Sequence, residues 1–371
     1  MKILVTGAKG FIGKNLVAEL KNREYTEIFE FDIDNDISLL DEYTKECDFV
    51  FHLAGVNRPK DDKEFMKGNY DFTRILLEKL SSYNNKATII MTSSIQAELD
   101  NSYGKSKKAG EEALLEFSKK AGNNVLIYRL SNVFGKWCRP NFNSVVATFC
   151  YNIANGLEII INNKDTVLNL IYIDDVINEF FDAMRENVAN HGEIRYIQST
   201  HSVSLGRIAE LIYQFKDSRH NLYIPDMSDE FTKKLYSTYL SYLPESNFSY
   251  QLKMNEDSRG SFTEFIKSSD RGQVSINISK PGIVKGNHWH HTKNEKFLVV
   301  SGKGLIRLRK INSDIIHDYY VSGDKLEVVD IPVGYTHCII NEGDTDMVTV
   351  MWANEEFNSN KPDTYYTEVI K

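Results

Sequence analysis

Hydrophobic and polar residues alternate in two ways along the first two thirds of the chain. Short apolar runs bounded by glycine or polar residues predict buried strands at 3–7, 27–32, 48–55, 87–94 and 124–132. Apolar residues spaced three and four apart predict amphipathic helices between them, at 73–80 and 107–120. Strands that alternate with such helices are typical of an α/β fold, so we expect a doubly wound parallel sheet covered on both faces.

The pattern changes near residue 246. Helical spacing disappears there, and short strands separated by turn residues are predicted at 273–279, 296–302, 304–310, 317–323, 325–334 and 346–352. Strands at such regular intervals indicate an all-β sandwich or barrel. The sequence therefore predicts two domains, at residues 1–245 and 246–371.

The composition fits two folded domains and excludes several classes of protein. The chain is 42% hydrophobic and 26% charged, which is typical of globular rather than disordered proteins. A net charge of −8 argues against broad binding to nucleic acid or anionic membranes. No apolar run approaches the roughly 20 residues of a membrane span, and we expect no signal peptide because Met1 and Lys2 lead directly into a strand. The four cysteines form no CxxC pair, so we expect a reducing, cytoplasmic location.

A glycine-rich turn follows the first predicted strand. Its sequence TGAKGFIG (6–13) contains G-x-x-G-x-x-G, and such glycines let the backbone approach a pyrophosphate at a helix N-terminus. Asp32 ends the second strand, where an acidic residue usually bonds a ribose hydroxyl. Asp32 thus favours NADH, whereas Lys9 could attract the 2′-phosphate of NADPH. The pattern predicts a Rossmann-type dinucleotide site formed by Gly7, Lys9, Gly10, Phe11, Ile12, Gly13 and Asp32.

The order of five motifs resembles a known family over residues 1–240. The glycine turn is followed by DFVFHLAG (48–55), the serine-bearing strand end TSS (92–94), YGKSK (103–107) and YIDDV (172–176), as in the extended short-chain dehydrogenase/reductases. The resemblance implies that the ribose on the nicotinamide side is contacted by Leu53, Ala54 and Gly55. It also favours NADPH over NADH.

Tyr103 and Lys107 form the centre of the expected catalytic group. Their spacing of four places both on one face of a helix. A nearby ammonium lowers the pKa of a phenol, which can then protonate a carbonyl oxygen as hydride reaches the carbon. The resemblance implies that Tyr103 is the acid, that Lys107 tunes its pKa and contacts the ribose, and that Ser94 holds the carbonyl oxygen. The loop from Ser94 to Tyr103 is short for the family, which leaves Ser93 and Thr92 as alternatives to Ser94.

Two residues beyond this group are expected to contact substrate. The segment RLSNVFG (129–135) resembles the part of the family that meets a sugar nucleotide, with Asn132 as the contact. Arg139 could reach a diphosphate with its planar guanidinium, although a surface arginine explains it equally well. Related 4,6-dehydratases carry an acidic pair on the serine strand where this chain has Ile95 and Gln96, so we expect reduction rather than dehydration.

Histidines in the second domain follow two signature segments of the cupin barrel. The first, G-x5-H-x-H-x4-E-x6-G, is matched by Gly282, His288, His290, Glu295 and Gly302. The second, P-x-G-x2-H-x3-N, lies within PVGYTHCIIN (332–341) and contains His337, although Leu326 replaces its usual first glycine. Residues two apart on a strand face the same side, so His288 and His290 can point into one barrel. The ligand types suit Zn, Fe, Mn or Ni without choosing between them, and we expect zinc, which needs no redox partner, at His288, His290, Glu295 and His337.

Two further segments, DSRGSFTE (257–264) and NKPDTYY (360–366), resemble cupin epimerases that act on 4-keto nucleotide sugars. Such an epimerase needs a proton-transfer base that is not itself a metal ligand. The sequence leaves Tyr335, Lys296 and His291 as alternatives.

The two domains in this order resemble capsular polysaccharide synthesis enzymes that join a reductase to a metal cupin. The resemblance implies that the cupin epimerises C3 of a UDP-2-acetamido-2,6-dideoxy-4-hexulose and that the reductase reduces its C4 ketone with NADPH, on the route to UDP-N-acetyl-L-fucosamine. Two alternatives remain: a 4-keto-sugar reductase whose cupin serves dimerisation or regulation, and a C4 epimerase with a permanently bound cofactor. We expect a UDP-sugar substrate and a homodimer.

Overall fold

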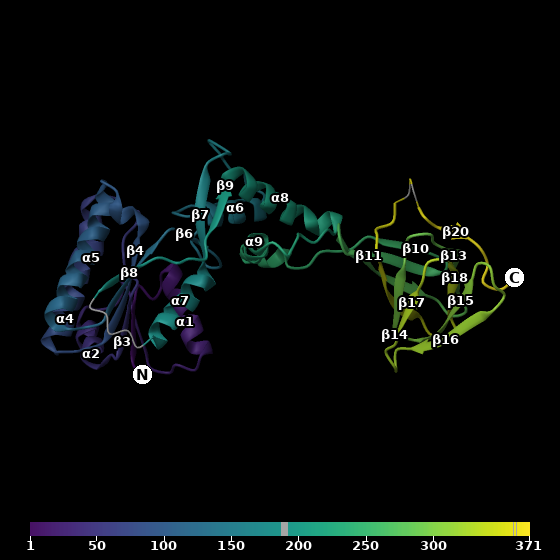
Figure 1. Cartoon of the computed structure of the whole chain (residues 1–371), viewed down its shortest axis with the longest axis horizontal. Helices are drawn as coiled ribbons and strands as arrows, with labels where there is room; N and C mark the ends of the chain where they lie inside the picture. The colour runs from purple at the N-terminus through teal and green to yellow at the C-terminus, as the bar shows by residue number, and fades with distance from the viewer. Residues whose placement is uncertain (187–191, 359, 361) are drawn as a thin grey trace. The chain divides into compact units, whose positions relative to one another are not determined.

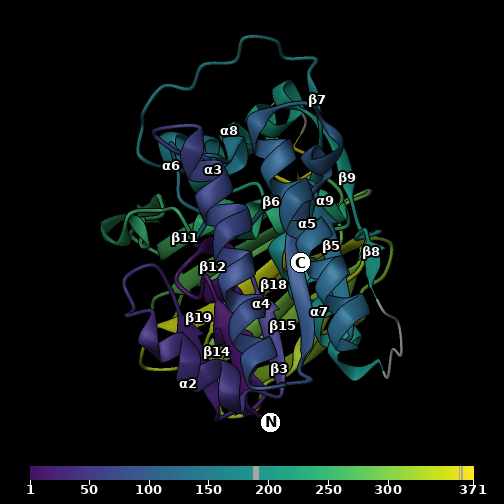
Figure 2. The ribbon, with the colours of Figure 1, turned by 90° about the vertical axis from the view of Figure 1, so that its left-hand side faces the viewer.

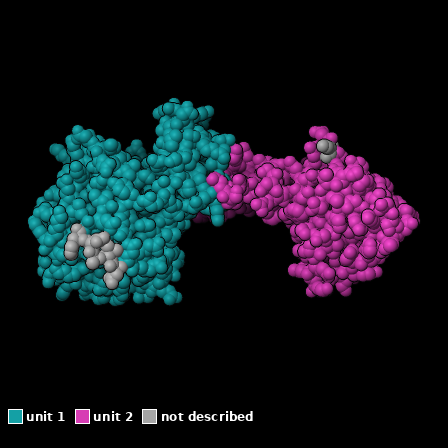
Figure 3. Space-filling model, viewed as in Figure 1, with its two compact units in different colours: residues 1–213, 230–244 teal, residues 214–229, 245–371 magenta. Residues whose placement is uncertain are grey.

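A computed structural model describes residues 1–186, 192–358, 360 and 362–371. The chain forms two compact units. Met1–Tyr213 and Glu230–Pro244 make up unit 1, and Gln214–Asp229 and Glu245–Lys371 make up unit 2 (Figure 3). Each unit has a hydrophobic core of its own. Across the described residues, none of the helices combines the length and apolar character that crossing a bilayer requires.

A parallel sheet of six strands forms the centre of unit 1 (Figure 1). Its order is β2-β1-β3-β4-β5-β8, with bounds β1 Ile3–Thr6, β2 Ile28–Phe31, β3 Phe49–His52, β4 Thr88–Ser94, β5 Val125–Leu130 and β8 Glu193–Arg195. Alternate residues of β1 enter opposite cores: Ile3 and Val5 one, Leu4 the other. Both faces of the sheet are therefore buried, as the continuous apolar runs of the strands predict.

Helices cover both faces of this sheet (Figure 1), and Figure 2 looks onto the helices of one face. One face carries α1 (Phe11–Asn22) and α7 (Ile173–Arg185), which contribute leucines and phenylalanines to the first core. The other face carries α2 (Ser38–Glu46), α4 (Phe72–Ser82) and α5 (Ser102–Ala121). The short α3 (Lys63–Met66) continues through a π-helical turn, Lys67–Asp71, into α4. The predicted doubly wound α/β sheet is confirmed.

A small second sheet adds to unit 1 beyond β5. Its order is β6-β7-β9, with β6 Asn132–Phe134, β7 Val167–Tyr172 and β9 His201–Ser204. The helices of this region are α6 (Val145–Ala154), which packs against α9 (Glu230–Leu240), and α8 (Leu205–Asn221), whose last part belongs to unit 2.

Unit 2 is built from two antiparallel sheets. The first has the order β10-β11-β12-β19-β14-β17, with β10 Met254–Asp257, β11 Gly260–Ser268, β12 Gly272–Ser279, β14 Glu295–Ser301, β17 Val328–Ile331 and β19 Met347–Ala353. The second has the order β16-β15-β18-β13-β20, with β13 Val284–Trp289, β15 Lys303–Lys310, β16 Ile316–Ser322, β18 Tyr335–Asn341 and β20 Tyr365–Tyr366. Apolar residues of both sheets, such as Phe297 and Ile306, share one core. The all-β second part is confirmed and is consistent with a cupin.

One segment departs from the expected single boundary after residue 245. Gln214–Asp229 groups with unit 2, although it precedes Glu230–Pro244 of unit 1. The reason is a backbone exchange: Ile224 N donates to Lys267 O and Lys267 N donates to Leu222 O, both at 2.8 Å. The exact domain limits stay a prediction, with this amendment.

Two glycines with left-handed backbones give a matched test of close packing. Gly7 has φ +71° and Gly122 has φ +76°, but a Cβ atom would lie 2.7 Å from Ala54 N at Gly7 and would touch nothing within 4 Å at Gly122. Both alanine variants should lose about 1–2 kcal/mol through the left-handed conformation. Gly7→Ala should lose a further ~1–3 kcal/mol through overpacking. Urea unfolding of the two variants measures the difference, and equal losses would contradict the close approach.

Candidate functional site

The glycine turn between β1 and α1 has the geometry of an anion cradle. A Cβ atom on Gly13 would lie 2.1 Å from Gly7 O, so the backbone is packed as tightly as glycine allows. Helix α1 has no acidic residue in its first turn, and no described side chain caps its N-terminal residue Gly10. The free N–H groups and the positive end of the helix dipole therefore face the turn. These features fit the pyrophosphate of a dinucleotide.

A cavity of about 540 Å³ brings most of the predicted reductase residues together. Its lining includes Gly7, Lys9, Gly10, Phe11, Ile12, Gly13, Leu53, Gly55, Ser94, Tyr103, Lys107, Asn132 and Arg139. The alternatives Thr92 and Ser93 line it as well. Of the predicted residues, Asp32 and Ala54 are absent from the lining of this cavity as the described chain forms it.

Asp32 lies beside the glycine turn rather than in the cavity. Its Oδ2 accepts a hydrogen bond from Lys9 N at 2.7 Å. The Lys9 ammonium pairs with Asp34, so both charges expected to select the cofactor's ribose have protein partners. Lys9 thus has two carboxylate partners, Asp32 at its backbone N–H and Asp34 at its ammonium. Asp32 is the residue expected to favour NADH, and the Lys9 ammonium is the group expected to attract the 2′-phosphate of NADPH.

The catalytic group lies where β4 ends and α5 begins. Helix α5 starts at Ser102 because Asn101 caps it, its Oδ1 accepting from Gly104 N at 2.7 Å. This start places Tyr103 in the first turn and Lys107 one turn later. Lys107 is buried, and its Nζ donates to Thr92 O at 2.9 Å.

The expected tuning of Tyr103 by Lys107 stays a prediction, and in this arrangement other groups act on the pKa of Tyr103. Burial raises the pKa of Tyr103, and its hydrogen bond with Ser94 offsets the rise only in part. The Lys107 ammonium instead points to the backbone of β4, and burial lowers its own pKa to about 8, against the raising effect of Glu111. The hydrogen bond with the Ser94 hydroxyl therefore favours the tyrosinate.

A buried ion pair lies next to the catalytic group, between Arg129 and Glu111. Two nitrogens of the Arg129 guanidinium donate to Glu111, Nε to Oε1 at 3.0 Å and Nη2 to Oε2 at 2.7 Å, and Ser93 Oγ donates to Oε1 at 2.5 Å. Glu111 lies one helical turn after Lys107 on α5, and Ser93 precedes Ser94 on β4. This role of Glu111 and Ser93 was not predicted from the sequence, although the spacing of Glu111 four residues after Lys107 was a possible signal.

The cavity also holds residues that the sequence reasoning missed. Asn69 has its side chain buried, donating to Val56 O at 2.8 Å and to Ser106 Oγ at 2.9 Å. Phe142 carries the Arg139 guanidinium over its ring, 4.9 Å from the centroid. The aromatic contact sets Arg139 apart from a free surface arginine.

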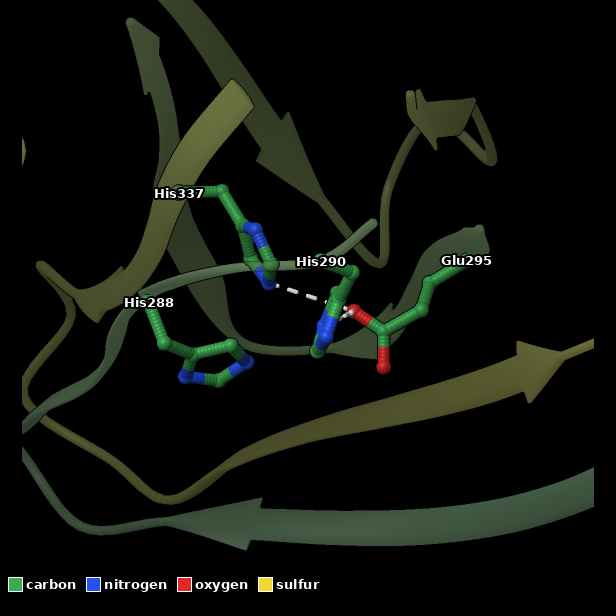
Figure 4. A group of neighbouring side chains, drawn as sticks. All are labelled: His288, His290, Glu295 and His337. Atoms are coloured by element: carbon green, nitrogen blue, oxygen red, sulfur yellow. Dashed lines mark ion pairs between the residues drawn. The ribbon is translucent and has the colours of Figure 1, made fainter. Parts of the chain in front are cut away.

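The four predicted metal ligands meet in unit 2. Ligand atoms of His288, His290, Glu295 and His337 all lie within 4.8 Å of one another (Figure 4). Glu295 Oε2 is 3.1 Å from His337 Nε2 and 3.5 Å from His290 Nε2. None of these three buried atoms has a hydrogen-bond partner among the described residues. Because buried polar atoms are rarely left unpaired, the cluster fits a divalent metal ion.

The ligands converge through a bulge as well as through strand alternation. His288 on β13 pairs with His337 on β18, after a register shift between Gly286 and His288. His290 lies one residue beyond the end of β13, and Glu295 begins β14. His291 is exposed and packs against Trp289, outside the ligand cluster.

Burial and the neighbouring ligands together determine the pKa values of the cluster. Burial and the nearby His337 lower the pKa of His288 to about 4, so its imidazole is neutral at pH 7. Burial alone would raise the pKa of Glu295, but the adjoining imidazoles of His290 and His337 outweigh it and hold the pKa below its usual value. Burial lowers the pKa of His290, but Glu295 and the Asp363 carbonyl outweigh burial and raise it. A metal ion would bind the imidazoles in their neutral form and the carboxylate in its ionised form.

A cavity of about 220 Å³ opens beside the cluster. His288, Glu295 and His337 line it, together with Asp257 and Arg259 of the segment 257–264 and with three residues that the sequence did not suggest, Asn255, Asn277 and Lys285. Lys285 Nζ is fixed by Asn277 Oδ1 at 2.7 Å and Ile278 O at 2.8 Å. The three expected alternatives for a base, Tyr335, Lys296 and His291, are not part of the lining found among the described residues.

Two family models match the chain in the same order as its units. The model of the NAD dependent epimerase/dehydratase family matches residues 3–197. The model of the polysaccharide biosynthesis C-terminal domain matches residues 255–365. The first match alone covers more than half of the chain.

Similar proteins extend this relation to the full length. The UDP-2-acetamido-2,6-beta-L-arabino-hexul-4-ose reductase of Pseudomonas aeruginosa is 44% identical, over 100% of this chain and 99% of that protein. The crystal structure of the capsular polysaccharide assembling protein CapF from Staphylococcus aureus is 56% identical, with a TM-score of 0.94 and full coverage of both chains. The dTDP-4-dehydro-6-deoxyglucose reductase of Escherichia coli is 27% identical, over 58% of this chain and 81% of that protein. The chain therefore belongs to the NAD dependent epimerase/dehydratase family, and it resembles CapF from end to end.

Proposed function

We propose that the chain is a bifunctional nucleotide-sugar enzyme with one active site in each unit. The observation that carries the proposal is the separation of two chemistries: a tyrosine–lysine–serine group beside a dinucleotide cradle, and a metal-ligand cluster in a barrel. The barrel epimerises C3 of a UDP-2-acetamido-2,6-dideoxy-4-hexulose, and unit 1 reduces its C4 ketone, on the route to UDP-N-acetyl-L-fucosamine for capsule. The names of the P. aeruginosa reductase and of CapF support this substrate and role.

Reduction at C4 uses side chains of the larger cavity. Ser94 donates a hydrogen bond to the C4 oxygen, and Tyr103 donates its proton there as C4 takes up hydride. A nicotinamide cofactor bound on the glycine turn supplies that hydride. Lys107, anchored on Thr92 O, places its positive charge beside the ribose. Asn132 and Arg139, which line the same cavity, bind the sugar and the diphosphate.

Epimerisation at C3 requires stabilisation of negative charge on the C4 oxygen when the C3 proton leaves. A divalent metal, which we propose to be zinc, supplies a Lewis acid for that charge when held by His288, His290, Glu295 and His337. Lys285 adds a fixed positive charge to the same cavity.

The proposed cofactor is NADPH, with Lys9 exchanging Asp34 for the 2′-phosphate. NADH is the second candidate, favoured by the carboxylate of Asp32 next to the glycine turn. We further propose a cytoplasmic homodimer, and four free cysteines fit a reducing compartment.

The central experiment is NMR of the product made from a UDP-4-keto-6-deoxy-HexNAc in heavy water with NADPH. Deuterium at C3, inverted C3 and a hydroxyl at C4 are expected together. A reduced product without label or inversion at C3 would leave a simple reductase with a non-catalytic cupin.

Tyr103→Phe should slow NADPH oxidation by roughly 10²–10⁴, the usual contribution of a general acid. The variant keeps the ring contact with Phe65 and should unfold at the wild-type temperature. Deuterium exchange at C3 should continue at the wild-type rate. Tyr83→Phe, at an exposed phenol, is the control. Near-normal turnover would remove Tyr103 from the mechanism.

The pH dependence of reduction should follow the ionisation of Lys107. Its lowered pKa of about 8 keeps it charged below that pH and neutral above it, so kcat/KM for NADPH oxidation should fall as pH rises through about 8. Glu111→Gln removes a charge that raises this pKa, and the fall should begin at lower pH. Glu112→Gln, at an exposed position of the same helix, should leave the profile in place. An unchanged profile in Glu111→Gln would contradict the coupling.

His290→Ala should lose bound metal and C3 exchange, because it removes one of four ligands. NADPH oxidation with a 4-keto sugar should continue in unit 1, and its product should keep the unepimerised C3 configuration. The neighbouring exposed histidine gives the control, His291→Ala, which should keep both metal and exchange. Metal analysis and product NMR separate the two variants. Loss of all reduction in His290→Ala would contradict two separate sites.

A further inference from the structure

The C-terminal segment Asp363–Val369 contacts each part of the barrel that carries the ligand cluster. Strand β20 within it pairs with β13, placing Tyr366 opposite His288. The Thr336 hydroxyl on β18, next to His337, donates to Thr367 O. We call Asp363–Val369 the C-terminal strap.

Asp363 fixes the loop between two of the ligands. Its carboxylate accepts the backbone N–H groups of His291, Thr292 and Lys293 at 2.9–3.0 Å, and the Thr292 hydroxyl at 3.0 Å. This loop joins His290 to Glu295. The Asp363 side chain therefore holds the first half of the loop, while Asn354 bonds Thr292 O and Asn294 N.

The backbone of Asp363 also determines the tautomer of His290. Its carbonyl oxygen lies 2.5 Å from His290 Nδ1, and because a carbonyl can only accept, Nδ1 must carry the hydrogen. The lone pair of His290 is therefore on Nε2, the atom that faces Glu295. Asp363 has φ +31°, a left-handed conformation that aspartate and asparagine tolerate better than most residues.

The far end of the strap is fastened as firmly. Arg309 is buried, and its Nε donates to Val369 O at 2.8 Å and its Nη2 to Glu368 O at 2.7 Å. Two anchors, Arg309 and the 291–293 loop, therefore hold the strap against the ligand-bearing strands.

We propose that Asp363 is a positioning residue of the metal site and that the C-terminal strap is its scaffold. The inference rests on the proposed metal centre and names the residue that orients His290 for it. Partners that orient a metal-binding histidine typically change metal affinity by about 10–100-fold when removed. Through its contacts with residues 291–293, Asp363 also influences the separation between His290 and Glu295.

Asp363→Asn tests the proposal in the full chain. Asparagine keeps the left-handed backbone and the carbonyl, but its amide group must face at least one N–H donor that the carboxylate accepted. Zinc affinity, measured by competition with a chromophoric chelator, should weaken about 10–100-fold. The absorption spectrum of the Co²⁺-loaded protein should also change, because a structural role away from the ligands would leave that spectrum alone. Asp314→Asn loosens another contact of the tail, the ion pair with Lys371, and should change neither readout.

Three results would overturn the positioning role of Asp363. Wild-type zinc affinity and an unchanged Co²⁺ spectrum in Asp363→Asn would overturn the inference while leaving the metal site in place. Failure of the wild-type chain to bind zinc or Co²⁺ would overturn the metal site and the inference with it. If Asp363→Asn does not fold, Thr292→Val removes one of the same contacts, and it should weaken zinc binding by a smaller factor; no weakening would overturn the inference.

Discussion

Burial of an ionised carboxylate among imidazoles is the constraint on which unit 2 is built. Charge in a protein interior is strongly unfavourable unless it is paired. Glu295 is 17% exposed and faces the ring nitrogens of His290 and His337. Among the described residues, His290 Nε2, Glu295 Oε2 and His337 Nε2 have no hydrogen-bond partner, but with His288 they supply four atoms that can bind one metal ion. Without its metal, the strands around it must hold the side chains together by packing and backbone contacts alone.

The two sites share one feature: a main-chain carbonyl accepts a hydrogen bond from a buried N–H group of a site residue. In unit 1, Thr92 O receives the Lys107 ammonium. In unit 2, Asp363 O receives His290 Nδ1. An accepting carbonyl fixes the direction of a flexible side chain without adding a charge that would change its chemistry. Glu111, near Lys107, shows the contrasting case, since its charge raises the lysine's pKa.

Much of this arrangement could be predicted because it depends on local spacing. The apolar runs predicted the strands of the parallel sheet, and the spacing of the glycines predicted the turn, although not its close packing against Ala54. The bulge before His288 could not be read in this way, because strand parity alone does not reveal a register shift. The pKa of Tyr103 depends on burial and on where the Lys107 ammonium turns, both set by tertiary packing. Asp363 was visible only as part of a resembling segment; its contacts reach back more than 70 residues.

The path of Gln214–Asp229 has a consequence for how such a protein can evolve. The chain leaves unit 1, contributes this segment to unit 2, returns through Glu230–Pro244 and then leaves again. Recombination of two related genes at a single point near residue 245 would join residues 214–229 of one parent to Lys267 of the other. The segment and Lys267 form backbone hydrogen bonds with each other. A barrel taken from a relative must therefore accommodate the interrupted segment 214–229 in addition to replacing the residues after 245.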